Sequence, residues 1–181
     1  LTGDVLGPLV LGASTTIGEY VIPSILGEYQ AKFPDVAVRL HVANTEGVLH
    51  MVENNEIDIG IVEGPVGNKN LVSKVCWDDE LVIVTPPEHP LTQNPISGID
   101  GILEYPFISR EEGSGTRDVI LDYLQSAGRD ISDLNLTMEF GSPESIKSAV
   151  AAGLGISILS IATLDKELTL GMLSKQSLDP P

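Results

Sequence analysis

The chain has 181 residues, of which 42% are hydrophobic and 20% are charged. This composition is typical of a globular protein and excludes an intrinsically disordered one. The 10 basic and 26 acidic residues give a formal net charge of −16. The chain therefore has little from which to build the positive surface that binding to nucleic acid or to an anionic membrane requires.

In the first part of the chain, short apolar strands alternate with helices. Residues 17–33 carry an apolar stripe at helical spacing, with Pro23 inside it. Either the first turn is irregular and the regular helix begins near Ile22, or the helix is kinked at the proline. The next helix begins after Asn44, a favourable N-cap. The strands that we predict in this part are residues 8–12, 36–42, 57–61, 71–75 and 81–85.

The proline-rich residues 86–90 interrupt this pattern, and a second series of strands and helices follows. One helix has apolar residues from Val119 to Ala127 and a stop signal at Gly128. Another begins at Ser142-Pro143, an N-cap followed by proline at the first helical position, and ends near Gly153. The remaining predictions are strands at residues 107–110, 136–140 and 155–159, a short helix at 163–167 and a strand end at 171–173.

This order of elements predicts an α/β protein with a largely parallel sheet, divided into two lobes. We place the first lobe at residues 1–84 plus 161–181 and the second lobe at residues 85–160.

Sequence motifs of catalysis and of metal binding are missing. Gly113-Ser114-Gly115 lacks the spacing of a nucleophile elbow, and Gly153-Leu154-Gly155 lies between a helix and a strand, the wrong order for a dinucleotide loop. The three histidines and the single cysteine have no zinc-binding spacing, and one cysteine cannot form an intrachain disulfide. We therefore expect no metal, no cofactor and no catalytic residue, and we interpret Cys76 as a small buried apolar residue.

Four polar turns each follow a predicted strand and precede a predicted helix. In an open parallel sheet such turns gather at the carboxyl ends of the strands, where ligands bind. The unpaired N–H groups of each helix start, together with hydroxyl groups, suit a carboxylate, sulfate or phosphate. The alternative is that these residues only cap their helices. The turns are Ser14-Thr15-Thr16, Asn44-Thr45-Glu46, Gly113-Ser114-Gly115-Thr116-Arg117 and Gly141-Ser142.

The third of these turns carries two further signals. Its two glycines allow the backbone to approach a ligand closely. Arg117 comes early in the helix that follows, where it would lie next to the ligand. Alternatively, Arg117 forms a salt bridge with Glu111, Glu112 or Asp118.

Seven segments, taken in order, resemble the effector-binding domain of LysR-type transcriptional regulators. They cover nearly the whole chain, and they are specific as a set. Ser-Thr-Thr-Ile-Gly-Glu-Tyr at residues 14–20 and Arg-Glu-Glu-Gly-Ser-Gly-Thr-Arg at residues 110–117 look most like the branch that includes the cysteine-biosynthesis regulator CysL and the carbon-fixation regulators. The segments are residues 9–23, 33–36, 44–45, 56–64, 87–91, 110–117 and 150–156.

The resemblance implies a fold like that of type II periplasmic binding proteins, with two Rossmann-like lobes and the effector in the cleft between them. It also implies that turns 14–16, 45 and 113–116 line that cleft. Members of the family carry an N-terminal winged helix-turn-helix that binds DNA, and they form dimers or tetramers. The effector-binding residues that we predict are Ser14, Thr15, Thr16, Thr45, Glu63, Gly113, Ser114, Gly115, Thr116, Arg117 and Ser142.

We therefore predict the effector-sensing domain of a bacterial transcription regulator, with a small anionic metabolite as ligand and sulfur or cysteine metabolism as a suggested pathway. DNA would be contacted only through the winged helix-turn-helix, which we expect to be absent from this chain, as is the last part of the first lobe. We expect self-association and no membrane contact. Residues 1–12 lack the features of a signal peptide, so we expect a cytoplasmic protein.

Two other functions are compatible with the same fold. A solute-binding protein of a transport system would need a signal peptide or a lipid-anchor cysteine near its start. An enzyme would need a charged catalytic residue in the cleft, for which Arg117 and Glu63 are the candidates.

Overall fold

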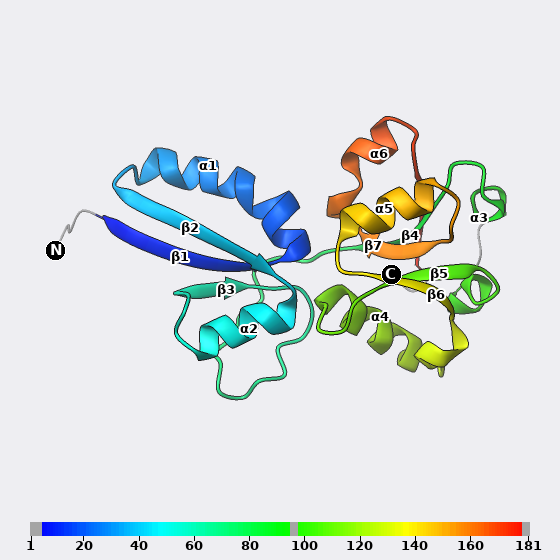
Figure 1. Cartoon of the computed structure of the whole chain (residues 1–181), viewed down its shortest axis with the longest axis horizontal. Coiled ribbons are helices and arrows are strands. Elements are labelled where there is room, and N and C mark those ends of the chain that lie inside the picture. Colours follow the sequence, from blue (N-terminus) through cyan, green and yellow to red (C-terminus); the bar gives the residue numbers. More distant parts are fainter. Residues whose placement is uncertain (1–4, 95–97, 179–181) are drawn as a thin grey trace. The chain divides into compact units, whose positions relative to one another are not determined.

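The structure is a computed structural model that describes residues 5–94 and 98–178. Its helices and strands form two compact units (Figure 1). The first unit comprises residues 5–73 and 113–115, and the second comprises residues 74–94, 98–112 and 116–178.

A parallel three-stranded sheet forms the centre of the first unit, in the order β2-β1-β3. β1 (Gly7–Ser14) lies between β2 (Val36–Ala43) and β3 (Ile59–Ile61). Ser14 is paired with Ala43, so β1 and β2 end at the same edge of the sheet. The turns that follow the two strands are therefore neighbours, as the sequence predicted.

Helices α1 and α2 cover opposite faces of this sheet (Figure 1). α1 (Ile22–Lys32) follows a π-helical turn at Ile17–Val21 and has proline in its first turn. Of the two alternatives, an irregular first turn or a helix kinked at Pro23, the first is correct. Proline is tolerated in the first turn of a helix because its missing N–H needs no partner there. α2 (Thr45–Glu53) begins at the predicted N-cap, where Asn44 Oδ1 accepts a hydrogen bond of 2.9 Å from the Gly47 amide.

α2 packs so close to the sheet that the residue of β3 facing it must be glycine. A Cβ atom on Gly60 in β3 would lie 2.9 Å from Val48 Cγ1 and 3.0 Å from Val52 Cγ2. On the other face, Ala13 and Ile17 form a small buried core under α1. The sheet is therefore fixed from both sides, and the turns at its carboxyl edge start from a rigid base.

The second unit contains antiparallel as well as parallel pairing, so the prediction of a largely parallel sheet is wrong for this part. β4 (Leu81–Thr85) pairs antiparallel with both β7 (Ser157–Ser160) and β8 (Ser174–Ser177). β5 (Pro106–Arg110) pairs parallel with β6 (Asn135–Phe140). Sequence patterns identify each strand, but the direction of pairing depends on how the chain returns to the sheet.

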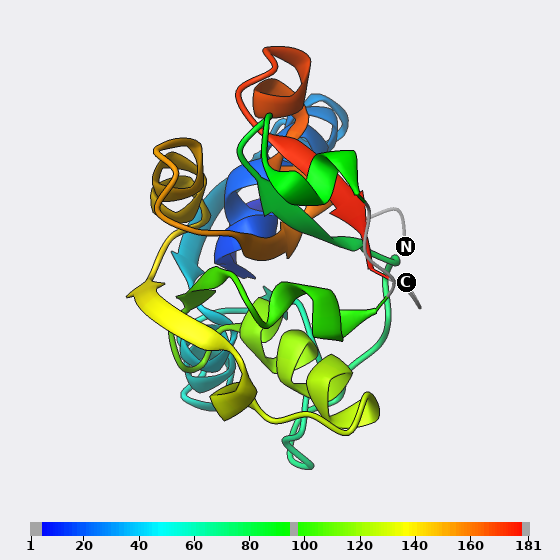
Figure 2. The same cartoon turned by 90° about the vertical axis from the view of Figure 1, so that its right-hand side faces the viewer.

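Two buried cores lie on either side of these strands. Ile83 of β4 points into the core that also holds Phe107 and Leu124, whereas Val82 and Val84 point into the core that holds Ile146. Burial on both faces explains why β4 is a continuous apolar run. α4 and α5 lie on different sides of the strands (Figure 2).

The helices of the second unit agree with most of the sequence predictions. Gly128 and Gly153 follow the ends of α4 and α5 with positive φ angles of 71° and 78°, as expected for helix stop signals. His89 caps α3 by accepting a hydrogen bond from the Leu91 amide at Nδ1. Partial burial lowers the pKa of the His89 imidazole, which favours the neutral ring that can accept this bond. The helices are α3 (Pro90–Gln93), α4 (Gly115–Ser126), α5 (Pro143–Ala151) and α6 (Asp165–Thr169), with 3₁₀ turns at Ile99–Ile102, Ile131–Asp133 and Ile161–Thr163.

Residues 62–80 form neither helix nor strand, so the predicted strand at 71–75 is wrong. Val72 is fully exposed and Val75 is 80% exposed. An apolar, β-branched segment is not a strand without a neighbouring strand to pair with. Cys76 lies in the same segment and is exposed rather than buried.

The compact units divide the chain differently from the predicted lobes. The prediction assigned residues 74–84 and 161–178 to the first lobe, but both segments belong to the second unit. The physical reason is the antiparallel pairing of β4 with β7 and β8, which holds these segments in one sheet. Among the described residues, no helix is long and apolar enough to cross a membrane.

Candidate functional site

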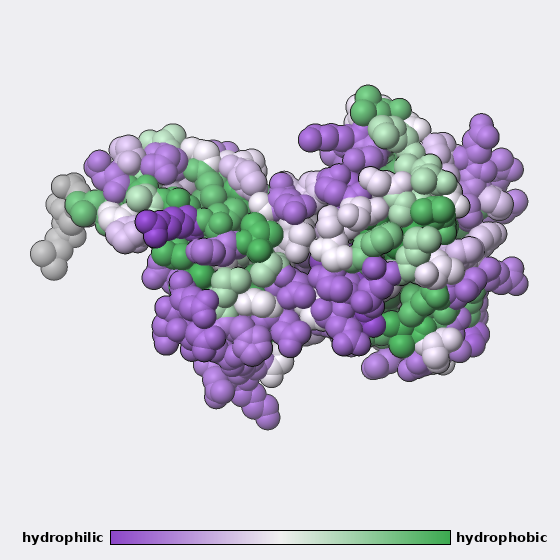
Figure 3. Space-filling model, viewed as in Figure 1, coloured by the Kyte–Doolittle hydropathy of each residue, from purple (hydrophilic) through white to green (hydrophobic). Residues whose placement is uncertain are grey.

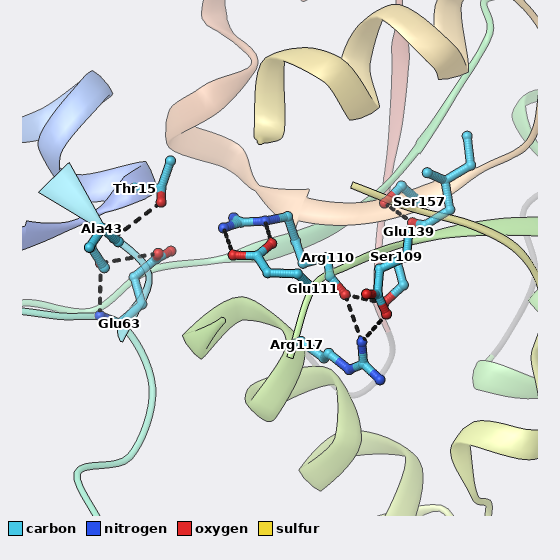
Figure 4. Close-up of polar contacts among 11 residues, drawn as sticks. Thr15, Ala43, Glu63, Ser109, Arg110, Glu111, Arg117, Glu139 and Ser157 are labelled. Carbon is cyan, nitrogen blue, oxygen red and sulfur yellow. Dashed lines mark hydrogen bonds and ion pairs between the residues drawn. The ribbon is translucent and has the colours of Figure 1, made fainter. Parts of the chain in front are cut away.

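The turn after β1 is tied to the chain that follows β3. Ser14 Oγ accepts a hydrogen bond of 3.2 Å from the Glu63 amide and lies 3.4 Å from a Glu63 carboxylate oxygen, to which it donates. Thr15 Oγ1 donates to the Ala43 carbonyl at the end of β2, over 3.2 Å (Figure 4). These hydroxyls hold the ends of neighbouring strands together.

The turn after β2 is attached to the same residue. Thr45, the first residue of α2, donates from Oγ1 to the Glu63 carbonyl over 3.1 Å. Glu63 therefore links the turns that follow β1 and β2 through its backbone and its side chain. The sequence predicted Glu63 as an effector-binding residue and as a candidate charged residue, but nothing in the sequence shows which strand ends it joins.

Residues 113–115 belong to the first unit and complete this cluster. The Glu46 amide donates to the Gly113 carbonyl over 3.1 Å. A Cβ atom on Gly115 would overlap the Glu63 carbonyl oxygen and would lie 2.6 Å from Thr45 Oγ1. Gly113 has a positive φ of 81°. Contact with the rest of the first unit therefore already requires both glycines, which the sequence analysis had assigned to close approach of a ligand.

In the second unit, Arg117 of α4 is held by neighbouring groups. Its Nη1 donates to the Arg110 carbonyl over 3.0 Å and pairs with Glu139 of β6 at 2.5 Å (Figure 4). Its Nη2 lies 4.0 Å from Glu112. Of the predicted salt-bridge partners, Glu112 lies near Arg117, and Glu139 is a further partner that was not predicted. Glu139 was missed as a partner because it is brought close by strand pairing rather than by sequence.

Arg110, the last residue of β5, was not among the predicted site residues. Its guanidinium is buried, and it pairs with Glu111 through two hydrogen bonds, from Nε over 2.8 Å and from Nη2 over 3.0 Å. The signal that could have found it is its position: it is a cation at the carboxyl end of a predicted strand, immediately before the third polar turn.

The remaining predicted residues lie at helix starts. Thr16 is buried at the start of the π-helical turn and makes no side-chain capping bond. Thr116 is buried in the first turn of α4. Ser142 is the N-cap residue of α5, also without a side-chain capping bond. Within the described ranges, no group of three or more His, Cys, Asp and Glu side chains is arranged to hold a metal ion.

The first unit thus brings Ser14, Thr15, Thr45, Glu63 and residues 113–115 together at the carboxyl edge of a parallel sheet, an arrangement typical of ligand-binding α/β domains. The chain belongs to the LysR substrate binding domain family, whose match covers residues 2–181. This confirms the resemblance found in the sequence.

Curated relatives of this family are transcriptional regulators. The uncharacterized HTH-type transcriptional regulator YeiE of Escherichia coli K12 is 35% identical over 175 residues, which are 97% of this chain and 58% of YeiE. A probable RuBisCO transcriptional regulator of Cyanidium caldarium is 35% identical over 176 residues, 96% of this chain and 56% of that protein. The chain therefore spans a little over half the length of these relatives. The likeness to carbon-fixation regulators is confirmed, and the transport alternative is not favoured.

Solved structures of similar fold include two with ligands. The regulatory domain of CcmR from Synechocystis PCC6803, in complex with 2-PG, has a TM-score of 0.85 and 36% identity, and covers 96% of this chain and 81% of that chain. The effector-binding domain of QuiR, in complex with shikimate, has a TM-score of 0.84 and 18% identity, and covers 98% of this chain and 83% of that chain. At this low identity the similarity shows the fold alone. The predicted fold, like that of type II periplasmic binding proteins, is confirmed.

Proposed function

We propose that this chain binds a small anionic metabolite and that binding controls a separate DNA-binding domain of a full-length regulator. The observation that supports the anion is a set of buried hydroxyl groups at strand ends and helix starts. Such groups, together with helix N-terminal amides, bind an anion without adding charge. The hydroxyl residues that are only 2–3% exposed are Ser14, Thr16, Thr45, Ser114 and Thr116.

The class of ligand is further supported by the CcmR regulatory domain, which is 36% identical and was solved with 2-PG. We infer that a compound with phosphate or carboxylate groups is the effector, and 2-PG is the first probe to test. Sulfate is the second probe, because it tests the suggested link to sulfur metabolism. Inorganic phosphate shows whether the anionic group alone is recognised.

The hydroxyl groups are tested by removing them one at a time. Thr16→Ala and Thr116→Ala should each weaken binding of 2-PG by about tenfold to a hundredfold, since a hydrogen bond to a charged group contributes roughly 1.5–3 kcal/mol. Isothermal titration calorimetry measures the change, and Thr169→Ala, at an exposed position of α6, is the matched control. If both variants bind like the wild type, the hydroxyls only support the fold and the proposal is wrong.

The wider role follows the same proposal. A winged helix-turn-helix outside these residues would contact DNA, and the protein would act in the cytoplasm as a sensor without catalytic activity. Glu63 and Arg117 are the two candidate catalytic side chains. Glu63 accepts a hydrogen bond from Ser14, and Arg117 pairs with Glu139, and these contacts support a role without catalysis.

We also propose that the domain self-associates through α1. Ile25 on this helix is 46% exposed, and apolar surface is visible over the first unit (Figure 3). Ile25→Glu should weaken self-association by about tenfold or more, because it places a charge where an apolar side chain would be covered. Sedimentation equilibrium measures this, with Glu28→Gln on the same helix as control. A wild-type domain that stays monomeric at high concentration would contradict the proposal.

A further inference from the structure

We propose that the Glu63 carboxylate competes with the effector anion for the Ser14 hydroxyl, so that the effector binds by displacing this carboxylate. The inference rests on the proposed function, and it adds the internal group that the anion has to replace. Both residues belong to the first unit. Ser14 Oγ donates a hydrogen bond to Glu63 Oε2 over 3.4 Å, and the same Oγ accepts one from the Glu63 amide over 3.2 Å.

The number of protons on the hydroxyl groups decides what an anion can bind at this edge of the sheet. A serine or threonine hydroxyl carries one proton, so it donates to one partner at a time. Thr15 already donates to the Ala43 carbonyl, and Thr45 donates to the Glu63 carbonyl. Ser14 donates to the Glu63 carboxylate. An anion that is to receive a hydrogen bond from one of these hydroxyls must therefore take the place of its present acceptor.

Ser14 differs from the other two hydroxyl residues because its acceptor is a side chain. The carbonyls of Ala43 and Glu63 belong to the backbone, which strand pairing at Ala43 and the close contact of Gly115 with the Glu63 carbonyl hold in place. The Glu63 side chain is only partly buried, so it can rotate into water, where an ionised carboxylate is well solvated. The Ser14 hydroxyl is thus the one that an anion can take over without a change in the backbone.

Charge explains why the anion replaces the carboxylate rather than binding beside it. Two negative groups within hydrogen-bonding distance of the same hydroxyl are close enough to repel each other strongly. The anion takes the position that the carboxylate leaves, which gives it access to Ser14 although Ser14 is only 2% exposed. The Glu63 amide still donates to Ser14 Oγ, so the hydroxyl keeps its place while its proton turns to the anion.

Displacement of the carboxylate also removes a contact between two strand ends. Glu63 follows β3 and its carboxylate accepts from Ser14 at the end of β1, so the exchange separates these groups. Glu63 lies near the start of residues 62–80, which form neither helix nor strand and run from the first unit into the second. The exchange at Ser14 therefore changes a contact of the segment that connects the two units.

The test changes Glu63 and measures the affinity for 2-PG and for inorganic phosphate by isothermal titration calorimetry. Glu63→Gln should tighten binding by about tenfold, because a neutral amide is a weaker acceptor for Ser14 and does not repel an anion. Glu63→Asp keeps the charge but withdraws it from Ser14 by one methylene group, so it should give a smaller gain. Glu56→Gln removes the same charge at an exposed position before β3, at the other end of the strand, and should bind like the wild type.

A double-mutant cycle shows whether the gain passes through Ser14. In a Ser14→Ala background, Glu63→Gln should bring little gain, because there is no hydroxyl proton to compete for. A gain as large as in the wild type would come from charge alone and would overturn the proposal. Ser14→Ala also removes an acceptor of the Glu63 amide, so thermal unfolding of each variant is measured first. If Ser14→Ala does not fold, Glu63→Asp decides instead, and equal affinity of Glu63→Asp and the wild type would overturn the proposal.

Failure of this inference differs from failure of the proposed function. If Glu63→Gln binds 2-PG no more tightly than the wild type while Thr16→Ala binds it more weakly, Glu63 is not a competitor and the proposed function stands. If neither the wild-type domain nor Glu63→Gln binds any of 2-PG, phosphate and sulfate, the proposed function is wrong and the competition is wrong with it.

Discussion

Replacing Lys147 with methionine is expected to destabilise the second unit by about 3 kcal/mol. Lys147 is only 4% exposed, and its Nζ donates to the Thr163 carbonyl and to Glu167, each over 2.8 Å, and pairs with Glu144 at 2.9 Å. Removing one partner of a buried ion pair costs roughly 3–5 kcal/mol, because the other charge stays behind uncompensated. We expect the lower end of this range, since Glu144 is largely exposed and regains water.

Glu167 is the residue that bears most of this cost. Within the described residues, its buried Oε2 atom has no hydrogen-bond partner, so Lys147 is the main compensation for its charge. Lys147→Met combined with Glu167→Gln should therefore recover part of the lost stability, as expected when a whole ion pair is replaced. Urea unfolding measures both variants, with Lys166→Met at an exposed position of α6 as control. A Lys147→Met variant within about 0.5 kcal/mol of the wild type would show that the pair does not stabilise the unit.

The order of strands and helices could be predicted because it depends on local patterns. Apolar runs at residues 81–85 and 107–110, the N-cap at Asn44 and the stop glycines after α4 and α5 each act within a few residues. The direction of pairing in the second unit could not be predicted in the same way. β8 lies far from β4 in the sequence, and its partner is decided by the three-dimensional return of the chain. The same limit explains why residues 71–75 look like a strand and are not one.

The candidate site could likewise be predicted only where its signals are local. Its hydroxyl residues were found because strand ends and helix caps leave a local signature at Thr45 and at residues 14–16. The contacts that decide what those residues do are long-range in sequence. Glu63 joins the turns after β1 and β2, and Arg117 pairs with Glu139 across two elements. No spacing rule anticipates such contacts, so the pairing of Arg117 with Glu139 became clear only in the structure.

Gly115→Ala is expected to reduce the affinity for 2-PG by about a hundredfold or more, the largest effect on binding among the substitutions considered. The added methyl group would overlap the Glu63 carbonyl oxygen and would lie 2.6 Å from Thr45 Oγ1. The Glu63 atom belongs to the backbone and cannot rotate away, so residues 113–115 must move off the first unit. That movement displaces Ser114 and disturbs the Thr45–Glu63 bond together, which removes more than one ligand contact.

The effect on folding should be smaller than the effect on binding. Overpacking typically costs about 1–3 kcal/mol, and a short segment at the edge of a unit relieves the overlap by shifting. Urea unfolding and calorimetry with 2-PG therefore separate the two effects. Gly27→Ala in α1 is the matched control, because beyond its chain neighbours and the backbone of its own helix no atom lies within 4 Å of the added Cβ, and alanine favours a helix interior. If Gly115→Ala binds 2-PG as tightly as Gly27→Ala does, the effector does not require residues 113–115 to rest on Thr45 and Glu63. The ligand contacts would then have to be sought away from the third polar turn.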